Sequence, residues 1–280
     1  MTEPGAPSAT LHCAKYHGLG NDFLVVLADA VPPRAAELAR ALCERRTGVG
    51  ADGLVVGTPS ARAGIDLVFH LWNADGGVAE ISGNGIRCLA HAEARRRGVD
   101  NLDLRVETLA GDRDVTVRPG RRAHEITASV TMGKPAPGPA LGGVPRAPGV
   151  DASRATTVDV GNPHLVLLVD DPDRVDVATA GPLIEAGFPG GINVHFVAPR
   201  TRDVLRLRVW ERGAGVTAAC GSGAVAAAYA AHEWGLVGEH VRVEMPGGDA
   251  DVVLGDQLTL VGPSVFVAEV IVPIGAIAHD

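Results

Sequence analysis

Short apolar runs alternate with helix-like segments along the first part of the chain. Apolar, β-branched runs predict strands at residues 23–28, 54–56 and 65–72. Residues 35–45 predict a helix, because Leu38 and Leu42 are spaced for one face. Residues 102–108 and 112–118 predict a hairpin that bends at Ala110-Gly111. The following stretch, residues 133–148, is rich in Pro and Gly and predicts a loop.

The second part of the chain repeats this order of elements. Its apolar runs predict strands at residues 156–160, 165–170, 193–198, 204–209, 241–245, 251–254 and 258–262. Residues 180–186 predict a helix, and an Ala-rich helix is expected at 224–232. A turn is expected at 246–248, and the last apolar segment, 265–273, is expected to add one more strand.

This repetition predicts an α+β fold made of two pseudo-symmetric domains that arose by internal duplication. We expect the first domain at residues 1–122 and the second at 123–264. Residues 265–280 are assigned to the first domain, which their strand would complete. The functional site is expected at the interface of the two domains.

Two short segments of the chain are built alike. Ile81-Ser82-Gly83-Asn84-Gly85 and Ala219-Cys220-Gly221-Ser222-Gly223 each place a small polar side chain before a Gly-x-Gly turn, and a helix-like segment follows each. The upstream context matches too, because Asn73 lies nine residues before Ser82 and Glu211 lies nine residues before Cys220. The same site motif occurs twice, with Ser in one copy and Cys in the other. This repetition indicates chemistry on two faces of one small ligand.

Cys220 is the strongest candidate for a reactive group. A helix N-terminus carries unpaired N–H groups and a partial positive charge, so the segments at Gly221-Ser222 and Gly83-Asn84 could each hold a carboxylate. The same field lowers the pKa of a nearby thiol. Cys13, Cys43 and Cys88 are interpreted as small buried residues.

Polar residues in loop-like contexts could recognise an amino acid. Asparagines that could bind a zwitterion occur in both halves, at Asn21, Asn73, Asn162 and Asn193. Arg212 could hold a second carboxylate, and the adjacent Glu211 could bind an ammonium group or orient a thiol. His164 could either be a satisfied interior histidine or polarise a catalytic group.

Composition narrows the class of protein. The chain has 280 residues, 46% of them hydrophobic, which indicates a globular protein, and its net charge of −8 argues against general nucleic-acid binding. No apolar run approaches the length of a membrane span, and the N-terminus has no signal pattern, so we expect no membrane partner and a cytoplasmic location. The four cysteines and ten histidines show no metal-ligand spacing, and no metal is expected.

Taken together, these motifs resemble the diaminopimelate epimerase family. The matching segments are residues 15–23, Asn73-Ala74-Asp75-Gly76, Gly83-Asn84-Gly85-Ile86-Arg87-Cys88, Gly161-Asn162-Pro163-His164, Glu211-Arg212-Gly213-Ala214-Gly215 and residues 219–223. The resemblance implies epimerisation of LL-diaminopimelate to the meso form without pyridoxal or any other cofactor. It also implies a sheet wrapped around a central helix in each domain, a cleft that closes on substrate, and a possible homodimer.

The resemblance also implies the role of each site residue. Two cysteines of the family face opposite sides of the substrate α-carbon, one removing a proton and the other returning one. By position, the catalytic residues would be Cys220, Ser82, Glu211 and His164. The substrate-binding residues would be Asn21, Asn73, Gly83, Asn84, Asn162, Asn193, Glu211, Arg212, Gly221 and Ser222.

Ser82 departs from this pattern, because the family has a cysteine there. Cys88 lies six residues later, inside the predicted helix, and does not fill the role. Ser82 could be an engineered replacement, or a natural residue of a slow or one-sided Ser/Cys epimerase. The site could instead serve another one-base reaction, such as dehydration or racemisation of a related amino acid, or only bind an amino acid.

Overall fold

The chain forms two halves with the same order of elements in the computed structural model, which describes residues 10–273. The first half comprises β1 (Thr10–Gly18), β2 (Asn21–Leu27), α1 (Ala35–Cys43), β3 (Gly53–Pro59), β4 (Leu67–Asn73), α2 (Gly83–Arg97), β5 (Leu102–Thr108), β6 (Gly111–Pro119) and β7 (Glu125–Gly133). In this half, α1 connects the parallel strands β2 and β3, and α2 connects the parallel strands β4 and β5.

The second half repeats these connections. It comprises β8 (Ala136–Pro137), β9 (Ala152–Asp159), β10 (Pro163–Val169), a 3-10 turn at Pro172–Arg174, α3 (Val177–Glu185), β11 (Asn193–Thr201), β12 (Val204–Glu211), β13 (Gly215–Val216), α4 (Gly221–Glu233), β14 (His240–Met245), β15 (Gly248–Val253) and β16 (Leu258–Pro273). Here α3 connects the parallel strands β10 and β11, and α4 connects the parallel strands β12 and β14. The two halves therefore share one topology, as the repeated sequence predicted.

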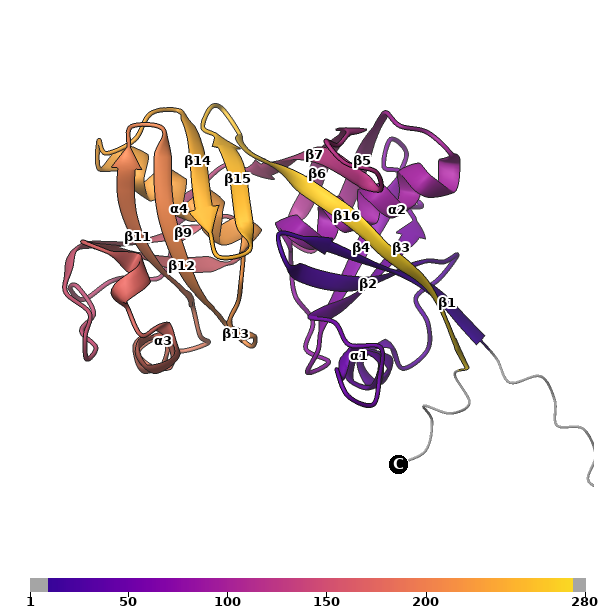
Figure 1. The fold of residues 1–280 in the computed structure, drawn as a ribbon, viewed down its shortest axis with the longest axis horizontal. Coiled ribbons are helices and arrows are strands. Elements are labelled where there is room, and N and C mark those ends of the chain that lie inside the picture. The colour runs from indigo at the N-terminus through magenta and orange to yellow at the C-terminus, as the bar shows by residue number, and fades with distance from the viewer. Residues whose placement is uncertain (1–9, 274–280) are drawn as a thin grey trace, which may run out of the picture.

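One long strand joins the two halves (Figure 1). β16 pairs with β15 and β7 along its first part and with β1 along its second part. The pairing of β16 with β1 closes the first half into a barrel of β1 to β7 and β16. In Figure 1 this strand runs from the lobe that contains α4 into the lobe that contains α2.

Each half is wrapped around its own helix. The first twelve residues of α2, Gly83 to Ala94, are all buried, and ten of the thirteen residues of α4 are buried. Alanine dominates α4 and leaves room for strands on every side, which is the pattern of a fully buried helix. The outer helix α1 instead buries one face, including Leu38 and Leu42, as its spacing predicted.

Most predicted elements are confirmed, with differences at their ends. α1 stops at Cys43 because Glu44 adopts an extended conformation, so the predicted end at 45 is wrong. The sequence analysis did not predict β1 and β7, because the alternating positions of these strands include small and polar residues such as Ala and Thr. The strands expected at 258–262 and 265–273 form the single strand β16. β7 lies beyond the proposed domain boundary at residue 122, yet it pairs with β6.

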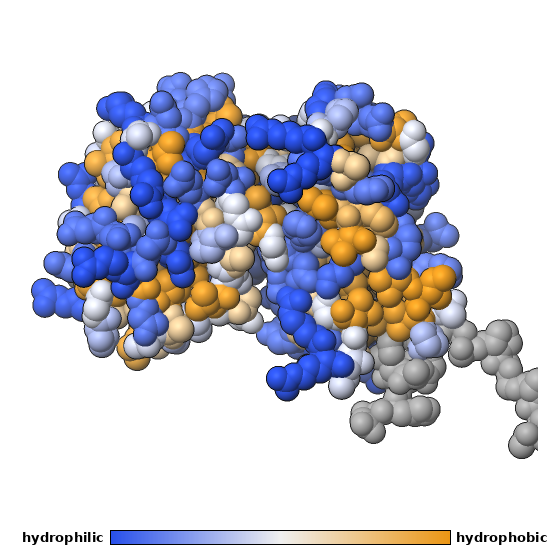
Figure 2. Space-filling model, viewed as in Figure 1, coloured by the Kyte–Doolittle hydropathy of each residue, from blue (hydrophilic) through white to orange (hydrophobic). Residues whose placement is uncertain are grey.

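Polar side chains cover much of the face shown in Figure 2. Apolar side chains gather on the right-hand lobe, which β16 crosses with Val267 and Ile271 exposed. The predicted homodimer stays a prediction. None of the helices in residues 10–273 is both long and apolar enough to cross a membrane.

Candidate active site

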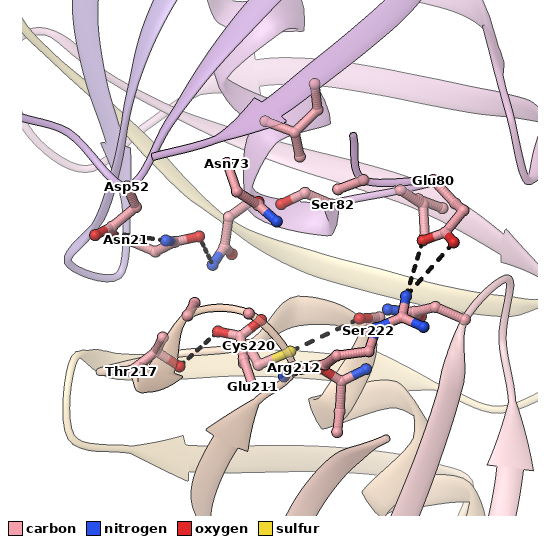
Figure 3. Close-up of a pocket in the computed structure, with 18 of the residues that line it drawn as sticks. Asn21, Asp52, Asn73, Glu80, Ser82, Glu211, Arg212, Thr217, Cys220 and Ser222 are labelled. Atoms are coloured by element: carbon pink, nitrogen blue, oxygen red, sulfur yellow. Dashed lines mark hydrogen bonds and ion pairs between the residues drawn. The ribbon is translucent and has the colours of Figure 1, made fainter. Parts of the chain in front are cut away.

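A polar cavity of about 420 Å³ lies between the two halves. Figure 3 shows side chains that approach it from both sides. All but one of the predicted site residues line it: Asn21, Asn73, Ser82, Gly83, Asn84, Asn162, Asn193, Glu211, Arg212, Cys220, Gly221 and Ser222. The exception is His164.

Ser82 and Cys220 occupy equivalent positions in the two halves. Ser82 is the N-cap of α2, and its Oγ accepts a hydrogen bond from the Gly85 N–H at 3.0 Å. Cys220 is the N-cap of α4, and its Sγ accepts one from the Gly223 N–H at 3.4 Å. Both residues have extended backbones, as N-caps require. The sequence repeat therefore corresponds to one local structure built twice.

The two helix N-termini meet at the cavity. The Gly85 and Ile86 N–H groups bond to Ser82, which leaves those of Gly83 and Asn84 without an intrahelical acceptor. The same arrangement in α4 leaves the N–H groups of Gly221 and Ser222 free of intrahelical bonds. The positive ends of both helices thus converge on one place, which suits a carboxylate.

Glu211 and Thr217 surround the Cys220 thiol. The Glu211 carboxylate accepts a hydrogen bond from the Thr217 hydroxyl at 2.5 Å, and the Cys220 Sγ lies 3.7 Å from the Ser222 Oγ. Burial raises the pKa of Cys220 well above its usual value, and the neighbouring Glu211 charge adds to this rise. Burial also raises the pKa of Glu211. The thiol is therefore protonated near neutral pH, beside a carboxylate that can take its proton.

The Ser82 side of the cavity has no such pair. The residue nine positions before Ser82 is Asn73, which lines the cavity where the other half has Glu211. A neutral amide cannot take a proton from the hydroxyl as a carboxylate can. The two faces of the cavity therefore differ chemically, although their backbones match.

The four predicted asparagines differ in how far they are already bonded. Asn21 donates to Asp52 at 2.8 Å and accepts from Asn84 at 3.0 Å. Asn193 bonds to backbone groups only, among them the Arg212 N–H. Within residues 10–273 the Asn73 side-chain amide has no hydrogen-bond partner, so it is the asparagine most available to a ligand.

His164 lies behind the cavity wall. Its Nε2 donates to the Asn162 Oδ1 at 2.8 Å, and its Nδ1 accepts from His195 Nε2 at 2.7 Å. Both rings are fully buried, and burial lowers the pKa of His164 well below its usual value. In this arrangement His164 is a neutral residue that orients Asn162, and its predicted catalytic role stays a prediction.

Arg212 reaches across the cavity to the other half. Its guanidinium donates to the Glu80 carboxylate at 3.2 Å, an ion pair drawn in Figure 3. It also donates to the Gly190 carbonyl at 3.4 Å. A substrate carboxylate that binds Arg212 must therefore compete with Glu80.

Sequence reasoning missed several residues of this site, among them Thr217, which bonds to Glu211, and three that contact predicted residues. Asp52 accepts a hydrogen bond from Asn21, Glu80 forms an ion pair with Arg212, and His195 is hydrogen-bonded to His164. Only Glu80 carries a local signal, as a charged residue two positions before Ser82 in an otherwise apolar segment. The other two act through partners that are 31 residues away in sequence.

Comparison with known proteins agrees with this architecture. The chain resembles the structure of a hydroxyproline epimerase from Agrobacterium vitis with bound trans-4-hydroxy-L-proline, with a TM-score of 0.73 over 94% of this chain and 92% of that one. At 16% identity this likeness concerns the fold alone. The shared fold is a two-lobed α+β fold with a closed strand barrel, as in that epimerase.

Sequence comparison narrows this class to one family. The diaminopimelate epimerase family model matches residues 13–136 and 156–266. The chain is 42% identical to the diaminopimelate epimerase of Pelotomaculum thermopropionicum over 257 residues, which cover 85% of this chain and 90% of that protein. It is 44% identical to that of Desulforudis audaxviator over 250 residues, or 84% and 88% of the two chains. The protein belongs to the diaminopimelate epimerase family.

Proposed function

We propose that the protein slowly epimerises LL-diaminopimelate to the meso form, with Cys220 as the base on one face and with unequal exchange of the α-proton at the two faces. The observation that carries this proposal is the unequal pair of N-caps: a thiol beside Glu211 on one side of the cavity, and a hydroxyl without a comparable partner on the other.

The proposed reaction follows from this geometry. The Cys220 proton passes to Glu211, and the resulting thiolate removes the substrate α-proton. The electron pair of the broken C–H bond moves onto the α-carboxylate, where the N–H groups of the two helices stabilise the added charge. A proton then arrives at the opposite face from the Ser82 hydroxyl, and a new C–H bond forms with inverted configuration. Ser82 regains a proton from water, and Glu211 releases its proton to the hydroxide that this leaves.

Ser82 limits the rate in this scheme. Efficient proton transfer needs groups whose pKa values lie near the working pH, and an aliphatic hydroxyl is far from that range. Exchange of the α-proton is affected more on the face that Ser82 serves, because Ser82 would have to act as the base there. Inversion itself slows by the same factor in kcat/KM in both directions, because the equilibrium constant is fixed. The one-sided property of the enzyme is therefore its α-proton exchange.

The test is exchange of the substrate α-proton in deuterated water, with LL- and meso-diaminopimelate. We expect the protein to introduce deuterium faster than it inverts configuration. Ser82→Cys should raise inversion by about 10²-fold or more, the range of a well-placed acid or base. Cys220→Ala, as the control, should abolish exchange.

Two results would contradict the proposal. If the protein binds diaminopimelate but exchanges no α-proton, the site is a binding site. If Ser82→Cys leaves inversion unchanged, Ser82 does not face the reacting carbon or the substrate is a different amino acid.

A further inference from the structure

Arg87 is the largest fully buried side chain of the described residues. It lies in α2, one turn after the N-cap Ser82. Its Nη2 donates to the Asn84 Oδ1 at 2.5 Å and its Nε to the Pro263 carbonyl at 3.3 Å, whereas Nη1 has no protein partner within residues 10–273. No carboxylate in that part of the chain lies within ion-pair distance of it. The guanidinium is thus a buried cation without an acidic partner.

The barrel makes room for this cation. Gly18 of β1 and Gly262 of β16 flank it, and a β-carbon at either position would lie 3.2 Å from a guanidinium atom. Burial lowers the pKa of Arg87 only to about 10, so the group stays charged near neutral pH. Burying an unpaired charge destabilises a fold, so a stable barrel by itself does not require this residue.

Hydrogen bonds connect Arg87 to residues that line the cavity. Asn84, which it holds, donates through Nδ2 to the Asn21 Oδ1 at 3.0 Å and to the Ala219 carbonyl at 3.3 Å. Ala219 directly precedes Cys220. One chain of hydrogen bonds therefore connects Arg87 to the helix end that would hold the substrate carboxylate and to the residue before the base.

We propose that Arg87 is a positioning residue for this reaction: it fixes Asn84, and the substrate α-carboxylate supplies the negative charge that balances the buried guanidinium. The inference rests on the proposed epimerase function. Because the carboxylate gains charge as the α-proton leaves, the interaction with Arg87 strengthens on the way to the transition state. Loss of Arg87 should therefore lower kcat more than it raises KM.

The test uses Arg87→Met and Arg87→Lys in the full chain, with α-proton exchange of diaminopimelate as the readout. Arg113→Met is the matched control, since Arg113 is also buried but bonds to carbonyls of its own hairpin outside the cavity. We expect Arg87→Met to lower kcat of exchange about 10²-fold, as for loss of one preorganised charge-stabilising group. Arg87→Lys should recover part of that loss, and Arg113→Met should leave kcat within about twofold of the parent protein.

A thermal melt with and without diaminopimelate separates catalysis from folding. Arg87→Met should show a smaller increase in melting temperature on adding the ligand than Arg113→Met. If Arg87→Met does not fold, the Arg87→Lys variant decides, since a compact ammonium lacks the planar fork with which the guanidinium reaches Asn84 and Pro263, and the variant should still lose part of kcat.

Equal kcat losses in the Arg87 and Arg113 variants, or no loss in either Arg87 variant, would overturn the inference. Failure of the parent protein to exchange any α-proton would instead overturn the proposed function. The two failures are therefore distinguishable.

Discussion

Gly83 and Gly221 face each other where the two halves meet. A β-carbon at Gly221 would lie 3.2 Å from the Gly83 Cα, and one at Gly83 would lie 3.5 Å from the Gly221 Cα. Either would also meet the Leu260 side chain, at 2.8 or 2.6 Å. The absence of side chains here lets the two helix N-termini converge at the cavity.

Gly83→Ala should therefore damage both stability and activity. The new methyl group forces the helix ends or Leu260 to move, and such overpacking costs about 1–3 kcal/mol of unfolding free energy. Urea unfolding and α-proton exchange would measure the two effects. Gly142→Ala is the control, because nothing lies within 4 Å of a β-carbon there. Equal behaviour of the two variants would contradict the close approach.

Glu211→Gln should make Cys220 react faster with an alkylating reagent but slow the exchange of the substrate α-proton. The Glu211 charge raises the pKa of the Cys220 thiol, so its removal makes the thiolate easier to form. Alkylation by iodoacetamide near pH 8 should then accelerate, about tenfold for each unit by which the pKa falls. Exchange of the substrate α-proton should fall about 10²-fold, because the acceptor of the thiol proton is gone.

The alkylation experiment needs a thiol-specific control. Cys220→Ser shows the background from Cys13, Cys43 and Cys88, whose pKa values burial raises to between about 11 and 12. If Glu211→Gln slows alkylation of Cys220, the Glu211 charge does not raise the pKa of the thiol and this prediction is wrong.

Glu80→Gln should tighten substrate binding. Glu80 pairs with Arg212 in the empty cavity, so its neutralisation removes a competitor for the guanidinium. Partly exposed ion pairs contribute about 0–1 kcal/mol, which corresponds to a KM lower by up to about fivefold. Glu107→Gln, which weakens the surface pair with Arg62, is the control and should not change KM. A higher KM in Glu80→Gln would mean that this carboxylate itself binds substrate.

The buried histidine His91 should make stability depend on pH. Its Nδ1 bonds to the Ser264 hydroxyl and its ring packs on Tyr16, and burial, with the Arg95 charge, lowers its pKa from 6.5 to about 4. The folded state disfavours the protonated form of His91. The free energy of unfolding is therefore at its full value above pH 6.5 and decreases as the pH falls from 6.5 towards 4. The loss amounts to about 3 kcal/mol at most, at 1.36 kcal/mol per pH unit.

Denaturant unfolding at several pH values between 4.5 and 7.5 would measure this loss. His91→Gln should flatten part of the profile, whereas a change at the exposed His240 should leave it unaltered. His195, with a pKa that burial lowers to about 3, contributes in the same direction and remains in both variants. An unchanged slope in His91→Gln would contradict the prediction.

Many structural features of this protein could be predicted from its sequence because they depend on residues that are close together in the chain. The repeated Ser/Cys-Gly-x-Gly segments predicted two helix N-caps, and an N-cap depends only on a few neighbouring residues. The central and outer helices and most strands were likewise visible in the spacing of apolar residues. The family itself was recognisable from short motifs, and the comparisons confirm it.

Tertiary structure decided what depends on partners distant in the chain. Sequence assigned the last strand to the first half, but nothing local indicates that β16 runs unbroken through Pro263 from one half into the other, because its partners β1 and β7 start about 250 and 130 residues earlier. The roles of Asp52 and His195 arise only when separate loops and strands meet at the cavity. Arg87 is the clearest case: in sequence it is one basic residue of a helix, and only the closed barrel removes it from water and places it against Asn84 at the start of α2. Helix caps are decided by adjacent residues, whereas burial and charge balance are decided by the whole fold.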